Sequence, residues 1–314
     1  MKNRPSATVA NDPLAVPGAQ LVLGTAQFGM AYGASNTRGR ISLVEVDDIL
    51  DRAVQNGIML VDTAPAYGES EEVVGAYLRR NPQLGVVTKT LHFSGSRITA
   101  AEIAALRSNV DLSQTRLGRS SLDAVLVHHG RDLCKPGGDA IWSALVNLQA
   151  QGKIKRIGVS IYDRDELEAI LDRFNPSIVQ VPLNVLDQRL DASGMLDTLR
   201  TRHVEIHARS VFLQGVLLAE QERAGHHFQR HAAVLSRYRQ FLGDTGMSAL
   251  AACLGYAMRV AAADRIVVGV SSLDELDEVL AALRKIPTQL PDFAGLACAD
   301  PDLIDPRRWP AVTV

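Results

Sequence analysis

Short apolar runs alternate with longer amphipathic segments along the chain from residue 21 onward. The apolar runs have the length and the β-branched content typical of buried strands, and the segments between them carry hydrophobic residues at helical spacing. We predict eight strands, over residues 21–24, 58–62, 86–89, 123–128, 155–160, 178–181, 204–208 and 265–269. Strict alternation of strands and helices predicts a parallel sheet that is covered by helices.

Capping patterns mark the expected starts of four helices. An oxygen-bearing side chain is followed three residues later by glutamate, a spacing that satisfies free backbone N–H groups at a helix start. The four pairs are Ser42 with Glu45, Thr99 with Glu102, Asp163 with Glu166, and Ser272 with Glu275.

Eight strands are the number that closes a (β/α)8 TIM barrel of class α/β. A doubly wound open sheet is the rival fold, but it usually carries G-x-G-x-x-G after its first strand, where this chain reads LGTAQFG. We therefore predict a single barrel domain over residues 20–314, preceded by a flexible tail over residues 1–19. A long loop after strand 7, over residues 214–246, and an irregular C-terminal tail after Pro287 interrupt the regular pattern.

Composition narrows the class of protein. The 314 residues carry a formal net charge of -2, which argues against a nucleic-acid partner, because such binding needs a concentrated basic surface. Three distant cysteines, Cys134, Cys253 and Cys298, indicate a reducing compartment. The N-terminus lacks the apolar core of a signal peptide, and no apolar run is long enough to cross a membrane. We expect a cytoplasmic monomer or small homo-oligomer with neither a nucleic-acid nor a membrane partner.

Polar residues follow the predicted strands at their carboxyl ends, where a barrel enzyme places its active site. Asp62 ends the second strand, Tyr67 lies in the next loop, Lys89 ends the third strand and His128 ends the fourth. An ammonium about 4 Å from a phenol stabilises the phenolate by up to roughly 4 kcal/mol, or about 3 pKa units. We therefore expect Lys89, oriented by Asp62, to lower the pKa of Tyr67. Tyr67 could then donate its proton to a carbonyl held by His128.

The same motifs resemble the aldo-keto reductases, oxidoreductases of the TIM-barrel fold that use NADP or NAD. The resemblance covers roughly residues 20–285 through LGTAQFG, DTAPAYG with Glu71 and Gly75 after it, VVTK, DAVLVH, GKIKRIGVS, VQVPLN and VVGVSSLDELDEVL. It implies a bacterial member in which Tyr67 is the catalytic acid/base and Asp62, Lys89 and His128 complete a tetrad.

The resemblance also implies a set of cofactor-binding residues. Gly24, Thr25 and Ala26 match the loop beside the nicotinamide ribose, and Ser160 and Gln180 match the carboxamide ligands. The pyrophosphate loop and the start of the last helix supply the others, which are Ser210, Phe212, Gln214, Gly269, Ser271 and Ser272. An anion at a helix N-terminus is physically reasonable.

Three positions depart from the common family pattern. Ile161 replaces the usual carboxamide-binding Asn, and Arg209 stands where the nicotinamide ring would stack, so that it could stack on the ring or bind an anionic substrate. Glu275 and Val279 stand where relatives often have basic or amide residues, so that no basic residue stands at the expected 2′-phosphate position. Glu275 either favours NAD over NADP or only completes a cap, and both interpretations stay open.

The expected function is interconversion of a carbonyl (aldehyde, ketone or sugar lactol) and its alcohol or lactone. Phe28, Tyr32 and His129 are expected at the substrate pocket, beside Met30, Phe93 and Trp309, a modest aromatic set that favours a small or polar carbonyl substrate such as a sugar. One alternative is a cofactor-binding regulatory or weakly active relative, and another is a barrel hydrolase or an aldolase with Lys89 as Schiff base. His227 and His231 lie four residues apart but lack a zinc motif, so we expect no metal site.

Overall fold

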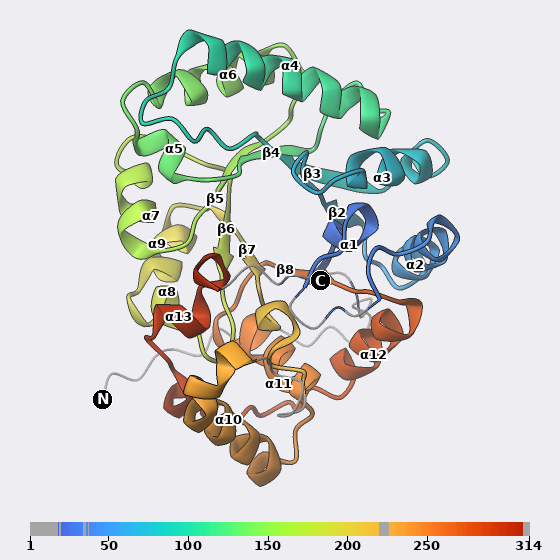
Figure 1. The fold of residues 1–314 in the computed structure, drawn as a ribbon, viewed down its shortest axis with the longest axis vertical. Helices are drawn as coiled ribbons and strands as arrows, with labels where there is room; N and C mark the ends of the chain where they lie inside the picture. The colour runs from blue at the N-terminus through green and yellow to red at the C-terminus, as the bar shows by residue number, and fades with distance from the viewer. Residues whose placement is uncertain (1–17, 19, 34–35, 37, 220–225, 310–314) are drawn as a thin grey trace.

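The computed structural model describes residues 18, 20–33, 36, 38–219 and 226–309. Eight parallel strands form one closed barrel in sequence order, as predicted, and helices surround it (Figure 1). The strands are β1 Leu21–Gly24, β2 Leu60–Asp62, β3 Gly85–Lys89, β4 Ala124–Val127, β5 Ile157–Ser160, β6 Ile178–Pro182, β7 Glu205–Arg209 and β8 Arg265–Gly269. The barrel closes because β1 pairs in parallel with both β2 and β8, with Gly24 opposite Asp62 on one side and Gly269 on the other.

The helices follow the strands along the chain. Their bounds are α1 Ala26–Gly29, α2 Leu43–Gln55, α3 Ser70–Leu78, α4 Ala100–Leu117, α5 Arg131–Cys134, α6 Asp139–Ala150, α7 Arg164–Leu171, α8 Arg189–Ala192, α9 Met195–Thr201, α10 Ala232–Thr245, α11 Ala249–Gly255, α12 Leu273–Leu283 and α13 Pro301–Ile304. Short helical turns lie at Leu213–Gly215 (η1), His226–His231 (η3), Tyr256–Val260 (η4), Ala294–Leu296 (η5) and Pro306–Arg308 (η6).

The four predicted helix caps are present. Ser42, Thr99, Asp163 and Ser272 each accept a hydrogen bond from the backbone N–H three residues later. Only Thr99 has the full reciprocal box, because Glu102 also accepts from the Thr99 N–H. These caps fix where α2, α4, α7 and α12 begin, and thus how each helix leaves the strand before it.

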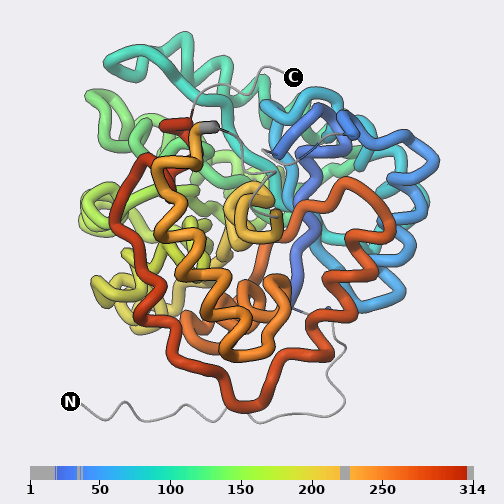
Figure 2. Tube along the Cα trace, turned by 60° about the horizontal axis from the view of Figure 1, so that its bottom comes forward, coloured from blue at the N-terminus to red at the C-terminus, as the bar shows by residue number. Residues whose placement is uncertain are grey.

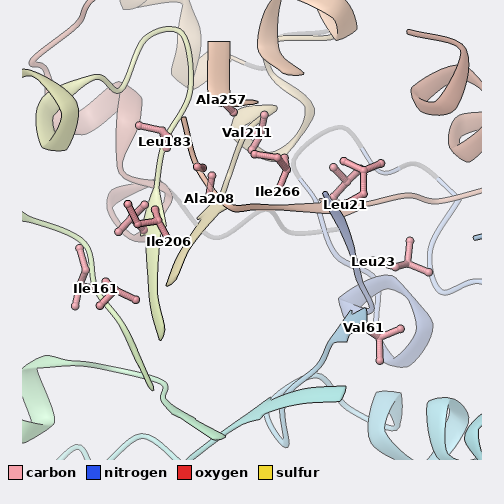
Figure 3. Close-up of a cluster of buried hydrophobic side chains, with 14 of the residues drawn as sticks. Leu21, Leu23, Val61, Ile161, Leu183, Ile206, Ala208, Val211, Ala257 and Ile266 are labelled. Carbon is pink, nitrogen blue, oxygen red and sulfur yellow. The ribbon is translucent and has the colours of Figure 1, made fainter. Parts of the chain in front are cut away.

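Most of the core lies between the sheet and the helices. Figure 3 shows part of it, with Leu21 and Leu23 on β1 and Ile206, Ala208 and Ile266 on β7 and β8 in one cluster. A second, smaller cluster is formed by Val87, Ala124, Leu126 and Ile178, with Leu60 packed against it. These five residues, called the inner cluster below, come from β2, β3, β4 and β6, and we place them inside the barrel, because successive residues of a strand face opposite sides of its sheet.

The segment after strand 7 differs from the prediction. Residues 232–245 form helix α10, so the expected long loop over 214–246 is wrong for much of its length. The Phe241 ring of α10 lies 5.1 Å from the Phe293 ring of the C-terminal tail, and Figure 2 shows α10 beside that tail. The apolar positions of α10 therefore pack on the tail, a contact that local sequence could not reveal. Apart from Gly18, the predicted flexible tail over 1–19 lies almost wholly outside the described residues and stays a prediction.

No helix among the described residues combines the length and the hydrophobicity needed to cross a membrane.

Candidate active site

A layer of polar side chains lies next to the inner cluster, on the side of the carboxyl ends of the strands. Asp62, Lys89, His128 and Gln180 each follow a residue of the inner cluster by two positions, on β2, β3, β4 and β6. Side chains two apart on a strand share a face, so all four point toward the barrel axis at the carboxyl ends of the strands. The sheet thus brings together residues that are up to 118 positions apart in sequence.

Asp62 and Lys89 form a buried ion pair at the centre of this layer. Their side chains are 4% and 1% exposed, and Lys89 Nζ donates to Asp62 Oδ1 and, over 3.0 Å, to the carbonyl oxygen of Thr63. Gln180 Nε2 donates to the second oxygen of the same carboxylate over 2.7 Å. Both Asp62 oxygens therefore have partners, as a buried carboxylate requires.

Tyr67 is held at the edge of this layer by its backbone. Its N–H donates to Ala64, its carbonyl oxygen accepts from the Ser70 N–H, and Gly29 of α1 packs directly against it. A Cβ on Gly29 would lie 1.8 Å from the Tyr67 carbonyl oxygen, so only glycine allows this approach. The half-buried phenol ring lies 5.0 Å from Lys89 Nζ and 6.0 Å from the His128 ring, edge to face.

The electrostatics of Tyr67 differ from the expectation. Burial raises the pKa of Tyr67 above its ordinary value, and the negative charge of Asp62 raises it further, while Arg209 acts in the opposite direction. The predicted lowering by Lys89 is therefore wrong in this structure. Burial disfavours the charged phenolate and is the largest cause, so it decides the direction of the shift. The protonated phenol is the favoured form.

His128 is held in its neutral form. Burial lowers its pKa to about 2, with further lowering by the positive charges of Lys89, His129, Arg209 and His92. His129 stacks between the other two histidines, with ring centroids 5.0 Å from His128 and 4.0 Å from His92. Burial and His92 also lower the pKa of His129. His128 and His129 can offer hydrogen bonds to a carbonyl oxygen, but both are poor proton sources near neutral pH.

Asp132, which the sequence did not single out, anchors this histidine stack. The carboxylate is buried, and its Oδ2 accepts from the Phe93 N–H over 3.1 Å and lies 3.3 Å from His92 Nδ1. Its other oxygen pairs with Lys135 over 2.7 Å. His92 and Asp132 belong to no motif, since His92 lies in the loop after β3 and Asp132 lies in helix α5, and only the barrel brings the two segments together.

The residues matched to the nicotinamide end of a cofactor lie in or beside the polar layer. Ser160 and Gln180 are opposite each other in register on β5 and β6. Thr25 is different, because its hydroxyl donates to the carbonyl oxygen of Asp62 and contacts Ser70, and the residue is fully buried. Thr25, between Gly24 and Ala26, thus fastens the end of β1 to β2 and presents backbone to the barrel mouth.

The loop after β7 is strained in the region expected to bind pyrophosphate. Ser210 and Gln214 have φ angles of 58° and 51°, in the left-handed region that non-glycine residues rarely adopt. Phe212 between them is only partly buried. Asn184 Nδ2 donates to the Ser210 carbonyl oxygen over 3.2 Å, and Gln214 Nε2 lies 3.4 Å from the Tyr32 hydroxyl. The loops after β1 and β7 therefore meet across the mouth of the barrel.

The start of α12 combines a cap with two charges. Glu275 accepts from the Ser271 N–H over 2.6 Å, so its carboxylate occupies the positive end of the helix next to Gly269 and the Ser272 cap. Arg38 donates to the Ser271 carbonyl oxygen over 3.1 Å and pairs with Glu45. The last helix has no basic residue at the position that the family pattern gives to a 2′-phosphate, but the loop after β1 brings Arg38 to this turn.

Three side chains expected at the substrate pocket have different locations. Phe28 is fully buried in the main core, so its assignment to the substrate pocket is wrong: helix α1 turns the ring inward. Tyr32 is 39% exposed and lies 6.5 Å from the Tyr67 ring, and His129 lies in the histidine stack. Trp309 packs edge-on against Phe228 with a centroid separation of 4.8 Å.

The donor set fits a nicotinamide dinucleotide. The Ser160 hydroxyl and the side-chain amide oxygen of Gln180 are polar groups beside Tyr67, which carries the proton. Arg209 offers a planar guanidinium, and the Ser272-capped helix offers a positive helix end. Glu275 at that helix end fits a ribose hydroxyl better than a phosphate, whereas Arg38 is the nearby cation that a phosphate would need.

A sequence profile of the Aldo/keto reductase family matches residues 20–294. The chain belongs to this family. Aldo-keto reductases use NADPH or NADH, so family membership agrees with the expected cofactor class and with an oxidoreductase.

Curated aldo-keto reductase relatives align over different shares of their length. The NADH-specific methylglyoxal reductase of Escherichia coli is 28% identical over 190 residues, which cover 55% of this chain and 57% of the relative. Glyoxal reductase of Bacillus subtilis is 30% identical over 55% of this chain and 60% of the relative. The chain thus spans less than two thirds of these two relatives. L-Galactose dehydrogenase of Arabidopsis thaliana is 26% identical over 82% of this chain and 84% of the relative.

The fold also matches a solved aldo-keto reductase. AKR11C1 from Bacillus halodurans, in its holo form, superposes with a TM-score of 0.70 at 19% identity, covering 92% of this chain and 95% of that one. This likeness supports the barrel architecture described above.

Proposed function

We propose that the chain is an NAD(P)-dependent oxidoreductase that interconverts an aldehyde, ketone or sugar lactol and its alcohol or lactone. The observation that carries the proposal is the convergence of Tyr67, the Asp62–Lys89 pair and His128 at one end of the barrel. A bound nicotinamide supplies or accepts the hydride at the carbonyl carbon.

Tyr67 would be the proton donor in the reducing direction. The carbonyl oxygen gains a proton as the carbon gains the hydride, and a protonated phenol can supply it. The raised pKa of Tyr67 keeps that proton on the phenol until the oxygen becomes basic. In the oxidising direction the same oxygen would accept the proton of the alcohol, so Tyr67 serves as acid or base according to direction.

The other residues would position and stabilise. Lys89, whose ammonium lies 5.0 Å from the Tyr67 ring centroid, would stabilise the phenolate that forms as the proton leaves. Asp62 and Thr63 keep the ammonium in place. Neutral His128 would hydrogen-bond the substrate oxygen without competing as an acid. Ser160 and Gln180 would orient the nicotinamide carboxamide.

The test is the loss of turnover in Tyr67→Phe, with Tyr32→Phe as the matched control. Both tyrosines face the same mouth, with ring centroids 6.5 Å apart, so removal of either hydroxyl perturbs a similar environment. The names of the three relatives reported above suggest a panel that contains methylglyoxal, glyoxal and L-galactose, assayed with NADH and NADPH. We expect Tyr67→Phe to lower kcat by about 100-fold or more, the scale of acid–base catalysis, and Tyr32→Phe to lower it far less. Full turnover in Tyr67→Phe would contradict the assignment.

A further inference from the structure

Two arginines clasp one tyrosine ring at the mouth of the barrel. The Cζ atoms of Arg209 and Arg307 lie 4.1 Å and 3.4 Å from the centroid of the Tyr162 ring. Arg209 ends β7, Tyr162 follows β5 and Arg307 belongs to η6 in the C-terminal tail. We call these three residues the arginine clasp.

The two guanidinium groups lie on opposite faces of the ring. Non-bonded carbon atoms touch at about 3.5–4.0 Å, so a group this close to the ring centre must lie over a face. Two groups stacked over the same face at these distances would overlap each other. Tyr162 is therefore sandwiched, and each guanidinium has its second face and edge free of the ring.

Both arginines are fixed in place. Arg209 donates to the Ile161 carbonyl oxygen over 3.0 Å and to Ser210 Oγ over 3.2 Å. Arg307 pairs with Asp305 through several hydrogen bonds, the shortest 2.6 Å. Prior immobilisation lowers the entropy that a ligand must offset when it binds.

The charge of Arg209 lacks an acidic partner within the described part of the chain. Lys89 pairs with Asp62, Arg307 with Asp305 and His92 with Asp132, but none of the ion pairs among the described residues includes Arg209. A half-buried guanidinium with only neutral partners is left ready for an anion, which binds it with charge-assisted and often bidentate hydrogen bonds.

The clasp borders the proposed chemistry. The positive charge of Arg209 is felt at the Tyr67 phenol and at His128, and the charges of Arg307 and Arg209 both lower the pKa of His129. Arg209 ends β7 and donates to the carbonyl oxygen of Ile161, the residue after Ser160, so the arginine clasp lies at the same end of the barrel as Tyr67.

We propose that the substrate is a carbonyl compound that carries an anionic group, a carboxylate or a phosphate, and that Arg209 and Arg307 bind that group. The proposal rests on the proposed oxidoreductase function and names its substrate class. Arg209 contributes the charge that has no acidic partner among the described residues. Arg307, which lies in the C-terminal tail on the other face of Tyr162, adds a second positive charge.

The test compares aldehydes that carry an anionic group with neutral counterparts. One pair is 4-carboxybenzaldehyde and 4-carbamoylbenzaldehyde, and the other is glyceraldehyde 3-phosphate and glyceraldehyde. The readout is the ratio of kcat/KM for the charged to the neutral member, so any effect of a variant on cofactor binding cancels. In the wild type we expect this ratio to be about 10 or more for the substrate pair, carboxylate or phosphate, whose anionic group matches that of the natural substrate. A ten-fold preference is the scale of a charge-assisted contact.

Variants then assign the preference to the clasp. Arg209→Gln should bring the ratio close to one, Arg307→Gln should lower it about three-fold, and Arg209→Lys should retain part of it, because the charge remains while the planar fork is lost. Arg80→Gln is the control, since Arg80 pairs with Asp47 on the outside of the barrel. A ratio near one in both arms of the wild type, or a preference that survives Arg209→Gln, would overturn the proposal.

A binding measurement distinguishes failure of the proposed oxidoreductase function from failure of the proposed anion site. If the protein reduces none of the four aldehydes, calorimetric titration of each into the wild type and Arg209→Gln, with NADH present, measures the anion site without turnover. Tighter binding of a charged member that Arg209→Gln abolishes would support the clasp. Equal binding of charged and neutral members would overturn it. Thermal melting followed by circular dichroism checks that each variant is folded.

Discussion

Gln180 Nε2 donates a hydrogen bond over 2.7 Å to the Asp62 oxygen that is not taken by Lys89. One carboxylate therefore holds both the cation expected to assist Tyr67 and the amide expected to meet the nicotinamide. The orientation of these two functional groups is coupled through Asp62, although they lie on strands β3 and β6.

Asp62→Asn should destabilise the fold strongly. The change keeps the shape of the side chain but leaves the 1%-exposed Lys89 ammonium without its counter-charge. Loss of one partner of a buried pair typically costs about 3–5 kcal/mol. Urea denaturation measures the change in the free energy of unfolding. The control is Asp111→Asn, which breaks the exposed pair with Lys153 and should cost about 1 kcal/mol or less. Equal effects of both changes would show that the buried pair has no special role.

Gly29→Ala should damage activity through Tyr67. The added methyl group would lie 1.8 Å from the Tyr67 carbonyl oxygen and 2.4 Å from the Ser70 nitrogen, so the loop that carries the phenol must move. A misplacement of about 1 Å can cost about 100-fold in rate. We expect kcat/KM to fall by about 10- to 100-fold in steady-state assays. Gly243→Ala in α10 meets open space and should leave kcat/KM unchanged. Normal activity in Gly29→Ala would mean that the position of this loop does not limit catalysis.

Acidification should destabilise the protein through its neutral histidine. The folded pKa of His128 is lowered to about 2, whereas the unfolded side chain binds a proton below about pH 6.5. The unfolded state therefore gains protons first, and stability falls by up to about 1.4 kcal/mol per pH unit as the pH drops below that value. Glu205, whose pKa is lowered to about 2, loses its contribution only below about pH 4.5.

Urea denaturation at pH 7 and pH 5 separates these contributions. The loss between the two pH values should be smaller in His128→Gln than in the wild type. It should be unchanged in His203→Asn, because His203 is exposed. An undiminished loss in His128→Gln would assign the acid sensitivity to other groups.

Glu275→Gln should raise the affinity for NADPH relative to NADH. The Glu275 carboxylate lies at the start of α12, where it would repel a 2′-phosphate, while Arg38 contacts the same turn. Removal of the negative charge removes that repulsion while Arg38 stays beside the turn, and we expect the ratio of the two affinities to shift about five-fold or more. Fluorescence titration with each cofactor measures this ratio. Glu278→Gln, an exposed position on the same helix, is the control, and an equal shift there would indicate a general charge effect.

Much of the barrel could be predicted because its signals are local. The apolar runs that end at Asp62 and Lys89 are long enough to predict a strand each. In this fold the carboxyl ends of all strands meet at one site, so the residues there can be grouped from the sequence. Strand boundaries differed by up to two residues, as for β2, which was expected from residue 58 and begins at Leu60. Backbone pairing of neighbouring strands sets those limits, and a single strand's sequence does not encode them.

The residues that were predicted wrongly or not at all have one physical cause in common, because tertiary contacts decide where their side chains lie. Phe28 is an aromatic residue of the kind that often lines a substrate pocket, but helix α1 directs its ring into the core. Arg38, Asp132 and Arg307 have no motif, and only folded loops bring them to the mouth. The pKa of Tyr67 was expected to fall because neither the burial of the phenol nor the effect of the Asp62 charge on it was taken into account.

Arg307 reaches Tyr162 from a tail that adds no strand to the barrel. Sequence changes in that tail can therefore alter the charge and shape of the mouth while the strands, the Asp62–Lys89 pair and Tyr67 stay the same. In evolutionary terms, the tail proposed to contact the anionic group of the substrate is separable from the stretch that folds the sheet, so its sequence can change without a change in the barrel.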